Sequence, residues 1–259
     1  MKKIYIHTDL EGISGIDKAE MVSDTKSPNY HYSIERLMAD VNAAVDGAFL
    51  GGADHVTVLD SHGGGNNFDM NLLDKRAQFD TKPNKKWWGI LDESYFGSFF
   101  IGAHAMAGTL HAFLDHTQSS ESIYNYYVNG RKMGELGQWA MVCAHFKVPV
   151  IMVSGDEAAV VEATQFFGDI ETAAVKKAVS RSSARLLPNE EAEERIRLAA
   201  KAAVLKNEKK QPFTPILPME IKIEFTRSDH LDRTMAPSIE RIDARTARKI
   251  SESYQDFWF

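Results

Sequence analysis

Apolar stretches typical of β-strands alternate with stretches of helical periodicity over the first 156 residues. "KIYI" (3–6) precedes a predicted helix from about Tyr32 to Gly51, where apolar residues recur three and four positions apart. A second helix is predicted from Glu135 to Phe146. Further strands are predicted at "HVTVLD" (55–60), "SFFIGAH" (98–104) and "PVIMVSGD" (149–156). This alternation predicts a mostly parallel sheet with helices on both faces.

The remaining segments predict an antiparallel excursion and a smaller second region. Asn129-Gly130, between β-rich runs, is a strong hairpin signal. Beyond residue 156 we expect a strand and turn at 172–181, a helix over 189–207 with Asn189 as N-cap, a proline-rich linker at 211–218, a half-exposed strand at 219–225, and a terminal helix containing Tyr254, Phe257 and Trp258.

The predicted fold class is therefore α/β, a three-layer α/β/α arrangement with a smaller α+β C-terminal region. We expect residues 1–155 to form the catalytic region and residues 156–259 to form the second region, which can be intertwined with the first. The length of 259 residues suits one large or two modest domains.

Composition narrows the classes of partner. The net charge is −6 and no basic run occurs, which argues against binding to nucleic acid or to an anionic membrane surface. The longest apolar stretch, Val148 to Val153, is far too short to span a bilayer. Cys143, the only cysteine, lies in a predicted buried helix face and allows no intrachain disulfide. We therefore expect a cytoplasmic protein without a nucleic-acid or membrane partner.

Residue types that bind metals follow four of the predicted strand units. Asp9 and Glu11 follow the first, His62 the second, His104 the third, and Glu135 the hairpin. In open α/β sheets the ligand crevice lies outside the carboxyl ends of the parallel strands. Three carboxylates and two imidazoles gathered there suit two divalent ions with open positions. The ions would also offset the repulsion between Asp9 and Glu11.

Each of these residues also has a reading without a metal. The Asp9–Glu11 pair alone is typical of a solvated loop, His62 of a turn cap, His104 of a core histidine and Glu135 of a charge at a helix N-terminus. The glycines after His62 resemble a phosphate-binding loop, but neither G-x-x-x-x-G-K-[ST] nor G-x-G-x-x-G is present. The coincidence of all four positions with strand ends favours the metal site.

The ordered motifs resemble those of the M55 family of zinc D-aminopeptidases. They are "TDLEGISG", "DSHGGGNN", "IGAHA", "NGRKMGELG", "VPVIMVSGDE" and "TAAVKKAVSR", and the resemblance runs over about residues 3 to 187. The resemblance implies an α/β fold, two Zn²⁺ per chain and, as in the family prototype, a decameric ring. It also implies that Asp9 bridges the two zinc ions, with Glu11 and His62 completing one site and His104 and Glu135 the other.

The resemblance further implies a catalytic histidine about a dozen residues after the "H-A" motif. His116 holds that position, although its spacing from His104 is one residue longer than in the prototype. His111 is therefore a competitor, but its apolar neighbours favour a packing role. His7 is a second departure, because the family usually has a serine there.

The activity that the resemblance implies is hydrolysis of the N-terminal residue of short D-amino-acid peptides. A histidine near the metals would move the proton to the leaving amine. Rival readings are a two-metal phosphoesterase, another amidohydrolase, or a non-enzymatic ring protein that binds a metal or small ligand. We also expect a homo-oligomer, because the aromatic segments at Trp87-Trp88 and Phe257–Phe259 suggest an interface.

Overall fold

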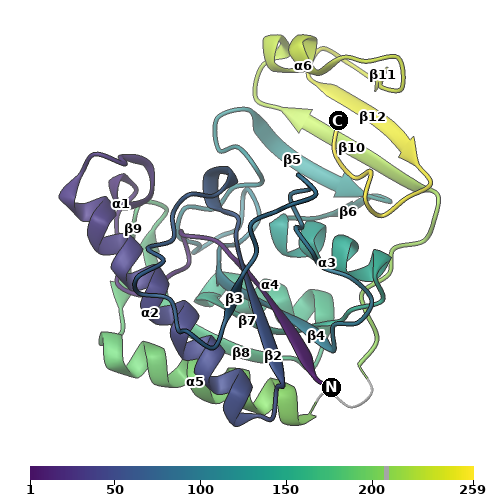
Figure 1. Ribbon diagram of the computed structural model, residues 1–259. Helices are drawn as coiled ribbons and strands as arrows, with labels where there is room; N and C mark the ends of the chain where they lie inside the picture. The colour runs from purple at the N-terminus through teal and green to yellow at the C-terminus, as the bar shows by residue number, and fades with distance from the viewer. Residues whose placement is uncertain (207–209) are drawn as a thin grey trace.

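The computed structural model describes residues 1–206 and 210–259. Two sheets dominate it, and the smaller one lies beyond the carboxyl ends of the parallel strands of the larger (Figure 1). The seven strands of the larger sheet, in spatial order, are β3 (Gln78–Phe79), β2 (His55–Asp60), β1 (Lys3–Thr8), β4 (Gly97–Ala103), β7 (Val150–Asp156), β8 (Glu171–Ser180) and β9 (Ser183–Leu186). All neighbours pair in parallel except β8 and β9.

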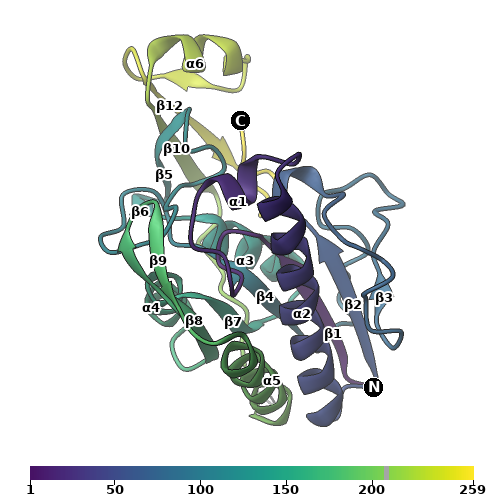
Figure 2. The same cartoon turned by 90° about the vertical axis from the view of Figure 1, so that its left-hand side faces the viewer.

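Helices cover both faces of this sheet. The helices longer than seven residues are α2 (Pro28–Leu50), α3 (Glu135–His145), α4 (Glu157–Phe167) and α5 (Asn189–Lys206). Helices α2 and α5 lie side by side on one face, where they bury Ile4 and Ile6 (Figure 2). Helices α3 and α4 cover the other face, which includes Tyr5. The predicted three-layer arrangement is confirmed.

The smaller sheet is antiparallel and takes strands from two distant parts of the chain. Its order is β11 (Glu240–Arg241), β12 (Thr246–Ser251), β10 (Met219–Phe225), β5 (Ile123–Val128) and β6 (Arg131–Lys132). Asn129 and Gly130 have positive φ angles of 51° and 76°, which confirms the predicted hairpin turn. The hairpin therefore belongs to this sheet instead of interrupting the larger one. The division into domains at residue 155 stays a prediction.

The chain differs from the predicted elements at several helices. The predicted terminal helix is wrong, because residues 252–259 contain turns and irregular backbone. Lys249 Nζ binds both the Asp256 carboxylate and the Trp258 carbonyl, and Tyr126 donates a hydrogen bond to the Phe257 carbonyl. These contacts hold residues 252–259 in an irregular, non-helical conformation.

Other boundaries also shift. Helix α2 begins four residues before the predicted start, because Pro28 is its first residue and Ser27 caps it by accepting a hydrogen bond from the Asn29 N–H. Asn189 lies inside α5, and its amide donates to the Tyr32 hydroxyl. The predicted last residue of this helix, 207, lies outside the described residues. Short helices α1 (Glu20–Ser23) and α6 (Ser228–Thr234) and the 3-10 turn η1 (His62–Gly64) complete the fold.

Candidate metal centre

The loop after β1 is pressed against the end of β4, which places Asp9 and Glu11 beside His104. The Gly12 N–H donates to the Gly102 carbonyl at 2.8 Å. A Cβ at Gly12 would lie 2.0 Å from the Ala103 carbonyl oxygen, and Gly102 has a φ of +81°. Glycine is therefore required at both positions, one for close backbone approach and the other for its conformation.

The three histidines near these carboxylates are all anchored by backbone carbonyls. His62 directs Nε2 to the Val22 carbonyl, His104 directs Nδ1 to the Ala105 carbonyl, and His116 directs Nδ1 to the Leu114 carbonyl, at 3.3, 3.1 and 2.8 Å. When the anchored nitrogen carries the proton, the other nitrogen turns a lone pair toward the carboxylates. Such anchoring is typical of histidines that bind metals.

Asp9 lies between two of these histidines. Its Oδ1 is 2.9 Å from His62 Nδ1, and its Oδ2 is 3.3 Å from His104 Nε2. Glu11 Oε2 is 3.1 Å from the same His62 nitrogen, and Glu135 Oε1 is 3.4 Å from His104 Nε2. The structure thus brings together all five of the metal-ligand candidates predicted from the sequence.

His116 also reaches this cluster. Its ring stacks on His104 with 3.9 Å between the centroids and 9° between the planes, and its Nε2 lies 3.7 Å from Glu135 Oε1. The loop between the two histidines folds back on itself, because the His116 N–H donates to the Ala105 carbonyl. His111 lies exposed at the loop tip with a φ of 57°, so its predicted packing role is wrong.

The donor atoms of this cluster fit metal ions. Two groups have ligand atoms within 4.8 Å of one another, Asp9–Glu11–His62 and His104–His116–Glu135. Among the described residues, His104 Nε2 and Glu11 Oε2 are buried and make no hydrogen bond. Buried polar atoms normally have a hydrogen-bond partner. Because nitrogen and oxygen lone pairs face one another here without such a partner, we infer that a cation binds between them.

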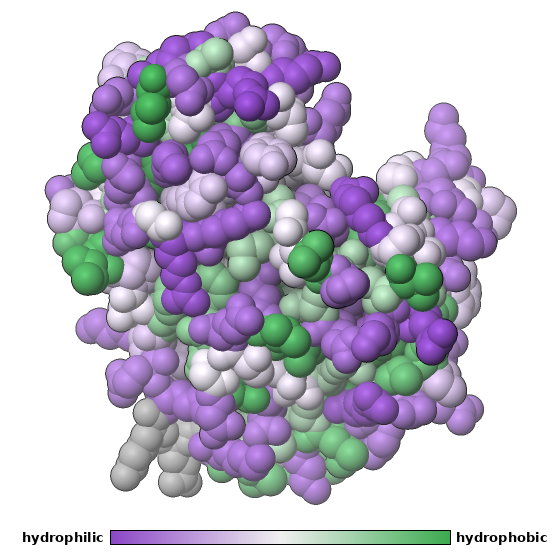
Figure 3. All heavy atoms as spheres, turned by 180° about the vertical axis from the view of Figure 1, so that it is seen from behind, coloured by the Kyte–Doolittle hydropathy of each residue, from purple (hydrophilic) through white to green (hydrophobic). Residues whose placement is uncertain are grey.

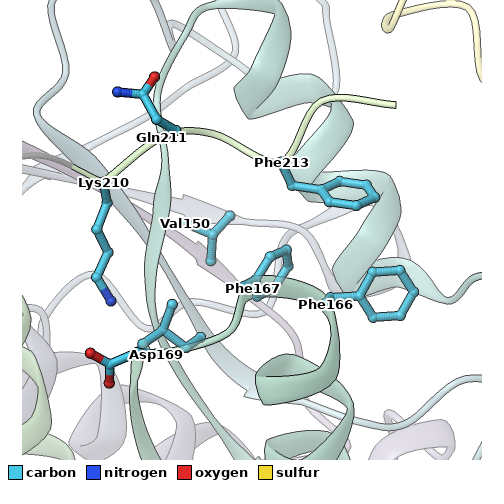
Figure 4. A pocket seen from close by; sticks show the side chains of 8 residues that line it. Val150, Phe166, Phe167, Asp169, Lys210, Gln211 and Phe213 are labelled. Atoms are coloured by element: carbon cyan, nitrogen blue, oxygen red, sulfur yellow. The ribbon is translucent and has the colours of Figure 1, made fainter. Parts of the chain in front are cut away.

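Figure 4 shows a different cavity, of about 280 Å³, that lies against the end of α4 and residues 210–213. Of the described residues that line it, Asp169 is the only carboxylate and none is a histidine. The cavity beside the histidine cluster is larger, about 640 Å³, and is lined by His7, Asp9, Glu11, His62, His116 and Glu135 among others. The residue types that can bind metals or transfer protons therefore line this larger cavity and not the one in Figure 4.

Residues 1–258 match the peptidase M55 family, described as D-aminopeptidase. The chain belongs to this family. It is 34% identical to a D-aminopeptidase of Bacillus subtilis (strain 168) over 226 residues, covering 86% of this chain and 81% of the relative. It also matches the solved structure of the Zn-dependent D-aminopeptidase DppA from Bacillus subtilis, described as a self-compartmentalizing protease. That match has a TM-score of 0.92 and 29% identity, and covers 98% of this chain and 93% of the other.

These matches confirm the family that the sequence motifs suggested. The M55 chain is a metal-dependent hydrolase, as expected, and the phosphoesterase and non-enzymatic readings are not favoured. Among the described residues, no helix of the M55 chain has the length and apolar character needed to cross a membrane.

The charges in the cavity of the M55 chain favour bound cations. Burial alone would lower the pKa of His62, but the neighbouring Glu11 and Asp9 carboxylates outweigh it and raise that pKa to about 12. Burial alone would raise the pKa of Glu135, but the His104 imidazolium outweighs it and lowers that pKa to about 2. The three carboxylates thus hold positive charge strongly, and a divalent ion would take the place of these protons.

His7, the residue that departs from the family pattern, packs against aromatic rings. Its ring centroid lies 4.2 Å from that of Trp139 and 4.4 Å from that of Phe100, and burial lowers its pKa to about 3. His7 also lines the cavity together with Trp87 and Phe257. The part of the cavity wall near His7 is therefore aromatic. Polar residues line another part of the wall, namely Gln118, Ser119, Ser120 and Glu121.

Three residues that support the site were missed in the sequence. The Gln118 N–H donates to Glu135 Oε1 at 2.7 Å, and Glu162 accepts a hydrogen bond from the Met106 N–H at 2.7 Å. Lys176 donates to the backbone carbonyls of Glu11, Ile13 and Ile16, at 2.5, 2.8 and 2.9 Å. The sequence feature that could have identified Lys176 is the position of a lysine within the apolar part of a predicted strand.

Replacing Lys176 by methionine should destabilise the fold. Burial lowers the pKa of Lys176 to about 7, an effect that the Asp156 and Asp40 carboxylates oppose. Methionine would leave three buried carbonyls without a donor, so we expect a loss of about 3 kcal/mol in the free energy of unfolding. Denaturant unfolding measures it. Lys177→Met, at the exposed neighbouring position, is the control and should change little; equal losses in both variants would contradict the role of Lys176.

The buried Glu162 carboxyl makes stability depend on pH. Burial raises its pKa from 4.5 to about 7, although the Met106 N–H opposes the shift. The folded chain therefore holds this proton more tightly than the unfolded chain, and stability is lost as pH rises from 4.5 to about 7. Because glutamine cannot ionise, Glu162→Gln should escape that loss.

The free energy of unfolding of Glu162→Gln, relative to that of the wild type, should rise between pH 5 and pH 8 by up to about 3 kcal/mol. Denaturant unfolding at both values, at one fixed zinc concentration, measures this difference. Glu157→Gln, on the exposed face of the same helix, is the matched control. A difference between the Glu162 variant and the wild type that does not change with pH would contradict this account.

Proposed function

We propose that this M55 chain is a two-zinc aminopeptidase that removes the N-terminal residue from short D-amino-acid peptides. The observation that carries the proposal is the position of Asp9, whose two carboxylate oxygens face two different histidines, His62 and His104. One carboxylate placed in this way can bind two ions at once. Family membership supplies the preference for D-residues.

The two sites follow from the same distances. Glu11 and His62 would complete one site around Asp9, and His104 and Glu135 would complete the other. Zinc ions held there would supply a water of lowered pKa and would polarise the scissile carbonyl. Side chains of the cavity would orient the peptide and move the proton.

His116 is the side chain proposed to move the proton. Its Nδ1 is held by the Leu114 carbonyl, which leaves Nε2 directed toward Glu135 and the cavity. That nitrogen can accept a proton from the attacking water and return it to the leaving amine. The alternative role is a third ligand beside His104 and Glu135, since these three side chains also form a compact donor group.

Chelation followed by zinc addition tests the proposed function. We expect the metal-free protein to be inactive on D-alanyl-D-alanine, and two equivalents of zinc to restore the release of free alanine. L-alanyl-L-alanine should be cleaved more slowly at every zinc concentration. Activity that survives complete chelation, or faster cleavage of the L-peptide, would overturn the proposal.

We also propose that the chain forms a homo-oligomer, because the matched Bacillus subtilis DppA is described as self-compartmentalizing. In the aromatic segments, Trp88 and Phe257 are buried within the chain, whereas Trp87 is 38% exposed, so their burial alone does not decide whether they form an interface. On the face in Figure 3, hydrophobic side chains are scattered among hydrophilic ones.

Light scattering at micromolar concentration should give a mass well above 29.0 kDa, with a decamer as the expected assembly. A monomeric mass would contradict the proposed oligomer. The cytoplasmic location stays a prediction.

A further inference from the structure

A second cavity adjoins the proposed catalytic cavity at His116. It has a volume of about 580 Å³ and shares His116 and Ser120 with the catalytic cavity. His116 thus stands at the junction of the two spaces. A peptide whose scissile bond lies at the carboxylate and histidine cluster can extend past His116 into the second cavity.

The proposed proton transfer sets the direction in which the peptide extends. A general acid must lie within hydrogen-bonding reach of the amine that it protonates. If His116 protonates the leaving amine, the leaving part of the peptide must begin beside His116. The second cavity is therefore on the leaving side of the scissile bond, and the aromatic end near His7 and Trp87 is on the other side.

Two cationic side chains line this second cavity, Lys132 and Arg181. Arg181 is already paired, because its Nε lies 3.3 Å from Asp115 Oδ1. Lys132, on β6, makes no ion pair or side-chain hydrogen bond within residues 1–206 and 210–259. Its Nζ would lie 3.0 Å from a Cβ placed on Gly108, so it is close to the loop that carries His116.

We propose that Lys132 binds the C-terminal carboxylate of the peptide and so makes the site selective for short peptides with a free C-terminus. This inference rests on the proposed aminopeptidase function. The leaving residue of a dipeptide carries its carboxylate one residue beyond the amine, and an ammonium with no other partner favours that charge. An amidated or much longer peptide places no carboxylate at this point.

Another opening of the catalytic cavity also carries lysines. Lys82, Lys85 and Lys86 line a space of about 260 Å³ that shares Ser61, Gly64 and Trp87 with the catalytic cavity. His116 does not line this space. A carboxylate bound there would require the peptide to run in the opposite direction, so these lysines supply a matched control.

The test compares Lys132→Met and Lys85→Met on D-alanyl-D-alanine and on its C-terminal amide. For Lys132→Met we expect KM for the free acid to rise on the order of 10-fold, the scale of a hydrogen bond to a charged group. Its kcat, its zinc content and its KM for the amide should stay close to the wild-type values. Lys85→Met should behave as the wild type on both peptides.

Equal effects of Lys132→Met on the acid and the amide would overturn the inference, and so would an acid-selective effect confined to Lys85→Met. Both outcomes leave the proposed function intact, because the wild type still cleaves the peptides. If the zinc-loaded wild type cleaves neither peptide, the proposed function fails and the inference fails with it.

Discussion

Replacing Asp9 by asparagine is expected to release both metal ions and to lower turnover by about 10³-fold or more. Among residues 1–206 and 210–259, Asp9 alone has carboxylate oxygens that face both His62 and His104. An amide carries no charge, and its nitrogen cannot bind a cation. The fold should persist, because asparagine retains an oxygen that can accept the hydrogen bond from the Leu10 N–H.

Zinc content per chain and turnover should be measured together for this variant. Glu11→Gln is the matched control, since Glu11 faces His62 and not His104; it should lose one ion and keep the other. Two tightly bound ions in the Asp9 variant would show that Asp9 does not bridge them. Loss of both ions from the Glu11 variant would show that the two sites are not separable in this way.

Replacing His116 by alanine is expected to leave the zinc content unchanged and to lower turnover by about 10²-fold or more. Its Nε2 lies 3.7 Å from Glu135, whereas His104 Nε2 lies 3.4 Å from Glu135 and 3.3 Å from Asp9. The closer histidine is the better candidate for a ligand. His116, at the junction of the two cavities, is better placed for the leaving amine.

His111→Ala is the control for this prediction, because His111 is exposed at the tip of the same loop. It should keep wild-type zinc content, stability and turnover. If His116→Ala loses one zinc ion, His116 is a ligand of the site at His104 and Glu135. If His111→Ala is the inactive and metal-replete variant, the catalytic role belongs to His111.

The parallel core of the fold could be predicted because its strands are buried runs with simple boundaries. The bounds predicted for "HVTVLD" are those of β2 in the parallel sheet, and the bounds predicted for the alternating "MEIKIEF" are those of β10 in the smaller sheet. The partner of the Asn129-Gly130 hairpin could not be predicted, because β5 pairs with β10, about a hundred residues later. A local pattern shows that a strand exists but does not identify a distant neighbour.

The tail shows a second limit of local patterns. Tyr254, Phe257 and Trp258 have spacing compatible with a helix, but the contacts that fix the tail come from Lys249 and Tyr126. Lys249 lies in β12 and Tyr126 in β5. Tertiary contacts of this kind override the weak helix preference of so short a segment.

Four of the five proposed metal ligands could be predicted because each follows a parallel strand, and the carboxyl ends of parallel strands meet. The fifth, Glu135, follows the hairpin of the smaller antiparallel sheet. Their support could not be predicted in the same way. Lys176 acts through backbone carbonyls of residues 11, 13 and 16, and Gln118 through its own backbone N–H. Backbone groups are present at every position, so the sequence does not show which carbonyls Lys176 binds and carries no signal for the Gln118 contact.

Anomalous diffraction at the zinc absorption edge, from crystals of the zinc-loaded protein, tests the two-metal site most directly. We expect two peaks per chain, both at bonding distance, about 2.0–2.2 Å, from Asp9. One should also contact Glu11 and His62, and the other His104 and Glu135, with His116 outside both coordination shells. A single peak, or two peaks of which one does not contact Asp9, would contradict the proposed site.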